Sequence, residues 1–164
     1  MREIVFALEF TGRGGPAPDS RTRRRARTTA PSQALRTTLA ASGITALVEV
    51  LPGEVAVLES QVERTPDGTF VEDGTINYGS AGAVTFDTVG RGHVGPAADG
   101  RGSHGVVMWR ITGGTGRFAD ASGRFVSHVH AVARLARTPK GGCDMQAVPL
   151  RELDIVNARG TLTY

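Results

Sequence analysis

The sequence predicts an all-β protein: a single antiparallel up-and-down β-barrel of about eight strands, with at most one short helix. Two observations carry this prediction. Apolar and polar residues alternate along much of the chain, and turn-forming residues recur at spacings of about 10–12 residues. Glycine occurs 22 times while aromatic residues make up only 5% of the chain, a composition that suits tight turns and disfavours long helices. Closure into a barrel would also remove the unpaired strand edges.

The first part of the chain is predicted to be a strand followed by a loop. A chain of 164 residues fits one domain over residues 1–164. Residues 1–10 read as a strand with alternating apolar positions, and residues 11–30 as a flexible loop rich in Arg, Gly and Pro. Five arginines lie between Arg21 and Arg27. Guanidinium groups bind phosphate, but no aromatic residue is interleaved with them, so a nucleic-acid partner is not expected.

The next segment holds the one candidate helix, over residues 31–41, with Pro31 in its first turn. Thr37 and Thr38 also allow a strand there. A strand over 44–51 is predicted to stop at a turn made by Pro52 and Gly53.

The rest of the chain reads as strands joined by turns. Residues 54–65 alternate well, and the sequence Pro66-Asp67-Gly68 after them is typical of a hairpin turn. The following strand is weaker, with a plausible bulge near Asp73-Gly74. The predicted strands from there on are 69–78, 82–93, 103–112, 123–137 and 154–164, with a loop over 94–102.

A glycine-rich stretch gives the chain a resemblance. Residues 111–118 read ITGGTGRF, and Ala121 and Gly123 follow. This stretch, roughly a tenth of the chain, resembles the GGTGRF…A.G segment of the dirigent and allene oxide cyclase superfamily, whose barrels are calycin-like. The resemblance implies an eight-stranded barrel that binds an apolar or phenolic molecule and guides its cyclisation or coupling without a cofactor. It also implies a homo-oligomer, a dimer or trimer. It transfers no catalytic residue, because the matching residues form a turn.

The same glycines have a second interpretation, as a loop that cradles phosphate with its backbone N–H groups. A P-loop requires Lys and then Ser or Thr after the last glycine, where this chain has Arg117 and Phe118. A dinucleotide site requires a following helix, and the chain continues as an alternating strand after Gly123. The turn interpretation is therefore favoured.

Four polar residues are the predicted catalytic groups: Glu59, Arg110, His128 and His130. Glu59 stands among apolar residues, and a carboxyl group in an apolar interior has a raised pKa and can act as a general acid or base. His128 and His130 are two residues apart, so on a strand both point to the same face. Alternation alone does not decide whether that face lines the interior, and a solvated outer face is the alternative for all of these residues.

Four large side chains are the predicted substrate-binding groups: Tyr78, Phe86, Met108 and Trp109. An i, i+2 histidine pair is also a metal-ligand geometry, which His93 and His104 could extend. No carboxylate follows at cupin-like spacing, so no metal and no other cofactor is predicted.

The predicted function is a small-molecule-binding barrel, a cofactor-independent cyclase or isomerase acting on an apolar, polyketide- or terpenoid-like substrate. A non-catalytic ligand carrier is the alternative, and an arginine-loop binder of nucleic acid or acidic surfaces is the third. The chain has no apolar run of membrane-spanning length and no signal-peptide pattern, so a cytoplasmic protein is expected, with no membrane partner. The single cysteine, Cys143, rules out an internal disulfide.

Overall fold

The structure is a computed structural model that describes the backbone of residues 3–16, 23–40, 43–96, 102–134, 136–142 and 150–164. Side-chain environments are described for residues 10–13 and for most of these ranges from Ala56 onward. The elements are nine strands and two short 3-10 helices, in the order β1 (Glu3–Pro16), β2 (Arg23–Ala40), β3 (Gly43–Arg64), β4 (Thr69–Asn77), η1 (Gly79–Ala81), β5 (Ala83–Thr88), β6 (Gly92–Pro96), β7 (Ser103–Gly114), η2 (Gly116–Phe118), β8 (Ser122–Arg134) and β9 (Arg151–Thr163).

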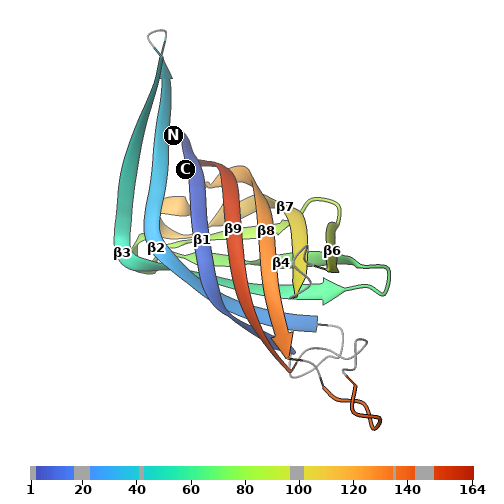
Figure 1. The fold of residues 1–164 in the computed structure, drawn as a ribbon. Helices are drawn as coiled ribbons and strands as arrows, with labels where there is room; N and C mark the ends of the chain where they lie inside the picture. The colour runs from blue at the N-terminus through green and yellow to red at the C-terminus, as the bar shows by residue number, and fades with distance from the viewer. Residues whose placement is uncertain (1–2, 17–22, 41–42, 97–101, 135, 143–149) are drawn as a thin grey trace.

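All the strands belong to one antiparallel sheet, in the order β3-β2-β1-β9-β8-β7-β5-β4-β6. β5 and β6 both pair with β4 and β7, so they share one position and the sheet has eight strand positions. β3 also pairs with β4, so the hydrogen bonds form a partial ring. Figure 1 shows the sheet curving round on itself, with β2 and β3 extending beyond the other strands. The all-β prediction is confirmed, and within the described residues no α-helix is present.

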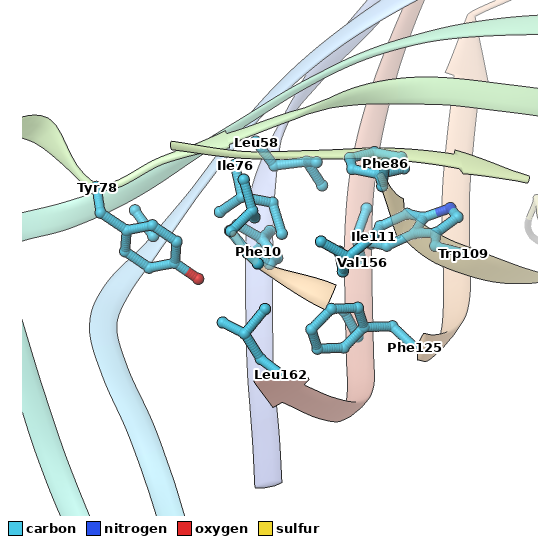
Figure 2. Close-up of a cluster of buried hydrophobic side chains, with 14 of the residues drawn as sticks. Phe10, Leu58, Ile76, Tyr78, Phe86, Trp109, Ile111, Phe125, Val156 and Leu162 are labelled. Atoms are coloured by element: carbon cyan, nitrogen blue, oxygen red, sulfur yellow. The ribbon is translucent and has the colours of Figure 1, made fainter. Parts of the chain in front are cut away.

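The two faces of the sheet differ sharply in burial. We call the buried side the inner face and the exposed side the outer face. Along β4, for example, Phe70, Glu72 and Ile76 are buried while Asp73 and Asn77 are exposed. Side chains from different strands meet on the inner face in one apolar core (Figure 2). The largest fully buried members are Trp109, Tyr78, Phe10, Phe118, Phe125, Leu58, Ile76, Leu162 and Val84.

The glycine-rich stretch is a turn, as predicted, and it closes one end of this core. β7 ends at Gly114, and η2 carries Phe118 into the interior, where it is fully buried. The Phe118 ring lies 5.1 Å from the ring of Tyr78 and 5.0 Å from that of Tyr164. Gly116 has a φ of +59°, in the left-handed region that favours glycine. The three rings therefore form an aromatic plug, contributed by the turn, β4's end and the end of β9.

The predicted loop over residues 11–30 is wrong where the structure describes it. Residues 11–16 continue β1, and β2 begins at Arg23. These segments pair with each other, and the residues of β1 also pair with β9, which satisfies their backbone hydrogen bonds. The register places Arg23 opposite Glu63 and Arg27 opposite Glu59 of β3, so acidic residues face the arginine-rich segment in the ladder. Residues 17–22 lie outside the described part of the chain.

The candidate helix over 31–41 is also wrong, because residues up to Ala40 belong to β2 and pair with β3. The predicted turn at Pro52 and Gly53 is absent for a related reason: β3 runs through both residues. Pro31 pairs with Val55 and Gln33 pairs with Val50, so the register slips at this point. An irregularity of this kind accommodates proline, which has no N–H group to give to a ladder.

Two further details of the strand prediction change. The expected bulge at Asp73-Gly74 is not formed, since β4 keeps a regular register with β3 and β5 there. Gly74 instead lies against the Phe86 ring and the backbone of β3, leaving no room for a Cβ atom. The single strand predicted over 82–93 is divided into β5 and β6 around Gly90, which has a φ of +70°. The hairpin turn after β3 is confirmed by the hydrogen bond from Gly68 N to Thr65 O.

Candidate functional site

A cleft opens into the inner face at the end of the core away from the aromatic plug. Its cavity volume is about 40 Å³, and it opens to solvent. Ser103 and Gly105, at the start of β7, line the cleft, whereas the plug follows the end of that strand. Seven of its thirteen lining residues are apolar aliphatic or aromatic residues: Leu58, Val62, Phe70, Val94, Val129, Ala131 and Val156. The other lining residues are Ser60, Arg64, Glu72, Ser103, Gly105 and Asp154.

Glu72 is the central polar group of the cleft. It is 5% exposed, and its Oε2 accepts a 2.9 Å hydrogen bond from Nε1 of Trp109. Thr88 fixes its backbone: Glu72 N donates to Thr88 Oγ1 at 2.7 Å, and Thr88 Oγ1 donates to Glu72 O at 2.7 Å. The carboxyl group is thus held by its side-chain and its backbone partners at once. This is the preorganisation that a binding or reacting group requires.

Burial raises the pKa of Glu72 from 4.5 to about 7. The charge of Asp154 raises it further, while hydrogen bonds from Ser60 and Trp109 lower it. A carboxyl group with this pKa is populated in both protonation states near neutral pH. It can therefore give a proton to a bound molecule or take one from it.

A second carboxyl group and a cation lie in the same cleft. Asp154 is 3% exposed and comes from β9, where the register places it opposite Ala131 of β8. Arg64 comes from the end of β3, and burial lowers its pKa while the charge of Asp154 raises it. The two groups stabilise each other's charge in a low-dielectric environment. The cleft thus holds Glu72, whose pKa is near neutral pH, together with the oppositely charged residues Asp154 and Arg64.

Strand alternation explains why these carboxyl groups are buried. Glu72 is in phase with Phe70 and Ile76, and Asp154 is in phase with Val156 and Ala158. Sequence reasoning missed Glu72, Asp154 and Arg64. In the first two cases alternation groups the acidic residue with apolar ones, but alternation alone does not show which group is buried.

The four predicted catalytic residues do not share an interior site. Glu59, Arg110, His128 and His130 are all exposed, so the prediction that they line the interior is wrong. Arg110 binds Asp87 on the outer face through two contacts, Nε to Oδ1 at 3.1 Å and NH2 to Oδ2 at 2.6 Å. These hydrogen bonds raise the pKa of Arg110. The four predicted residues are exposed because each of them is out of phase with the buried residues of its own strand.

The predicted substrate-binding residues divide between the two faces. Tyr78 belongs to the aromatic plug, and Phe86 stacks on Trp109 with ring centroids 4.2 Å apart (Figure 2). Met108 lies on the outer face, with 40% of its surface exposed. None of the four lines the cleft, but Trp109 reaches it through its hydrogen bond to Glu72.

Across the part of the chain that the structure describes, no three His, Cys, Asp or Glu side chains converge as a ready metal site. In the same ranges no helix is long and apolar enough to cross a membrane. Cys143 lies outside the described residues. Comparisons with protein-family models, with curated proteins and with solved structures find no match to this chain.

Proposed function

We propose that the sheet is an eight-stranded barrel of the dirigent and allene oxide cyclase kind, and that its cleft binds a small apolar organic molecule. We further propose that the protein converts this molecule as a cofactor-independent isomerase or cyclase. The observation that carries the proposal is Glu72, a buried carboxyl group with a pKa of about 7 in a mostly apolar cleft. A buried carboxyl group in a cleft whose pKa is raised to near neutral pH is typical of acid–base catalytic sites.

The roles follow from the contacts. Glu72 is the proton-transfer group, and the indole of Trp109 and the hydroxyl of Ser60 orient it. Asp154 with Arg64 supplies a second polar pole that can hold an oxygen atom of the ligand. The apolar walls would hold a flexible carbon skeleton in a reactive conformation, which is a large part of catalysis in a reaction without a cofactor. This assignment replaces the outer-face residues with interior ones.

A ligand carrier without catalysis is the second candidate. It is favoured by the predominance of apolar lining and by the fact that Glu72 already has hydrogen-bond partners within the protein. Both candidates require a bound small molecule, and they differ in whether Glu72 transfers a proton. They are therefore separated by one substitution.

Native mass spectrometry of freshly purified protein tests for a retained ligand. Ala131 lines the cleft, so Ala131→Phe should fill it and abolish retention. Val132, next to it on β8, is 58% exposed, and the matched control Val132→Phe should retain the ligand. Retention by the Ala131→Phe variant would remove the cleft as the binding site.

Incubation of the identified ligand with wild type and with Glu72→Gln then separates the two candidates. An isomerase loses turnover in Glu72→Gln and keeps binding, with a loss of about 10²–10⁴-fold for removal of a general acid or base. A carrier converts nothing in either protein. Turnover that survives in Glu72→Gln would show that another group does the chemistry.

A further inference from the structure

Three of the four histidines gather on the outer face of β7 and β8, away from the cleft. His104 of β7 pairs directly with His130 of β8, and their ring centroids are 4.6 Å apart. His128 is two residues before His130, so it is the diagonal neighbour of His104 on the same face. The rings of His104 and His128 stack with centroids 5.5 Å apart and an interplanar angle of 16°. The sheet thus brings three imidazoles from two strands onto one patch.

The spacing of two ring nitrogens is suited to a shared ligand. Nδ1 of His128 lies 3.4 Å from Nε2 of His104. The two nitrogens form a long hydrogen bond, with the donor set by the tautomers, beyond the usual N–H range of about 2.7–3.2 Å. Two imidazole nitrogens bound to one tetrahedral Zn²⁺ at about 2.0–2.1 Å are about 3.4 Å apart. The pair therefore already stands at the bite distance of a chelating histidine pair.

We propose that His104 and His128 form a surface site for a divalent transition-metal ion such as Zn²⁺, with His130 as the third ligand. The ring centroid of His130 lies 4.6 Å from that of His104, and a side-chain rotation is required to bring a ring nitrogen of His130 to the same ion. All three side chains are at least partly exposed, so an ion can enter from solvent. The remaining coordination position is left to water.

The surroundings favour a metal that prefers nitrogen ligands. The register places Val106 and Asn157 on either side of His128, and Ile155 beside His130. No carboxylate is among these neighbours, so a site built here offers imidazole nitrogens. Imidazole suits Zn²⁺, Ni²⁺ and Cu²⁺, whereas Mg²⁺ and Ca²⁺ prefer oxygen ligands. The site is separate from the cleft and does not depend on its proposed function.

Isothermal titration with ZnCl₂ tests the proposal on tag-free protein that has been stripped with a chelator and dialysed. We expect one saturable Zn²⁺ site per chain and no heat of binding with MgCl₂. His104→Ala and His128→Ala should each abolish saturable binding, and His130→Ala should weaken it. Zn²⁺ should raise the thermal unfolding temperature of the wild type, because it binds the folded state, and should not raise that of His104→Ala.

His93 provides the matched control. It is exposed on β6, and Val106 lies between it and His128 in the register. Among the described residues no ring contact joins His93 to the three clustered histidines. His93→Ala should therefore bind Zn²⁺ like the wild type. Unchanged binding in His104→Ala, or a loss in His93→Ala equal to that in His104→Ala, would overturn the proposal. Circular dichroism establishes that each variant is folded.

Discussion

At the scale of single residues, Glu72 makes the stability of the protein depend on pH. Its pKa is about 7 in the folded state, against 4.5 for an ordinary glutamate, so the folded protein binds the proton more tightly than the unfolded chain. Stability from this group is complete below pH 4.5 and is lost as the pH rises through about 7. The difference between the two pKa values corresponds to about 3 kcal/mol.

Glu72→Gln should remove this dependence. Glutamine keeps a side-chain oxygen for the indole of Trp109 but carries no charge. We expect the variant to be more stable than the wild type at pH 8, and the advantage to shrink toward pH 5. Urea unfolding at several pH values measures the difference. Equal slopes of stability against pH in the two proteins would contradict the raised pKa.

Trp109 gives a direct optical reading of the same group. It is the only tryptophan in the chain, it is fully buried, and its indole N–H donates to Glu72. Ionisation of the carboxyl group puts a full charge next to the indole, so the fluorescence should titrate with a midpoint near pH 7. The transition should be missing in Glu72→Gln. It should persist in Glu59→Gln, which changes an exposed carboxyl group and serves as the control.

At the scale of elements, the glycine-rich turn acts through the residue that it places in the core. Phe118 is fully buried against Tyr78 and Tyr164, whereas its neighbour Arg117 is exposed. Phe118→Ala should cost about 3–5 kcal/mol, because it leaves a cavity at the plugged end. Arg117→Ala should change stability by less than about 0.5 kcal/mol. Chemical unfolding measures both, and a similar small effect for the two variants would show that the plug contributes little.

Local sequence signals predicted the elements well where a strand alternates and ends at a tight turn. β3 from Ala56 onward, β4, β7 and β9 follow from period-two alternation. The same signals failed where tertiary pairing decides the outcome. Residues 31–40 can form a helix or a strand locally, and pairing with β3 selects the strand. Pro52 and Gly53 favour a turn locally, but the neighbouring strand accommodates them as a register slip.

At the scale of the whole molecule, predicting the candidate site from the sequence required knowing which face of each strand is enclosed. Alternation divides a strand into two sets of residues but does not say which set is inside when both contain apolar members. Residues 54–65 show this, because Val55 and Val57 share a phase with Glu59 while Leu58 is on the buried side. The strand pairings across the sheet, a partial ring, determine which set is enclosed, so that Glu72 and Asp154 are buried and Glu59 and His128 are exposed.

The positions of the two chain ends allow a test of what holds β3 against β4. Glu3 pairs with Thr163, and Figure 1 shows the two chain ends side by side. A short Gly/Ser linker can therefore join the ends, and a new opening can be placed between Asp67 and Gly68 in the turn that links β3 to β4. In this permutant the β3–β4 pairing, from Val57↔Asn77 to Arg64↔Phe70, has no turn to support it.

If this ladder and the core beneath it are what hold β3 against β4, the permutant should keep the near-ultraviolet circular dichroism of the wild type. Its Trp109 fluorescence should also titrate near pH 7. Glu72 lies on β4, one of the two strands whose connecting turn is cut, so this titration reports whether β3 and β4 still pair. A second permutant, opened at the exposed residues Lys140 and Gly141, keeps the β3–β4 turn and controls for the new linker. Native signals in this control together with their loss in the first permutant would show that the turn, and not the ladder, holds β3 against β4.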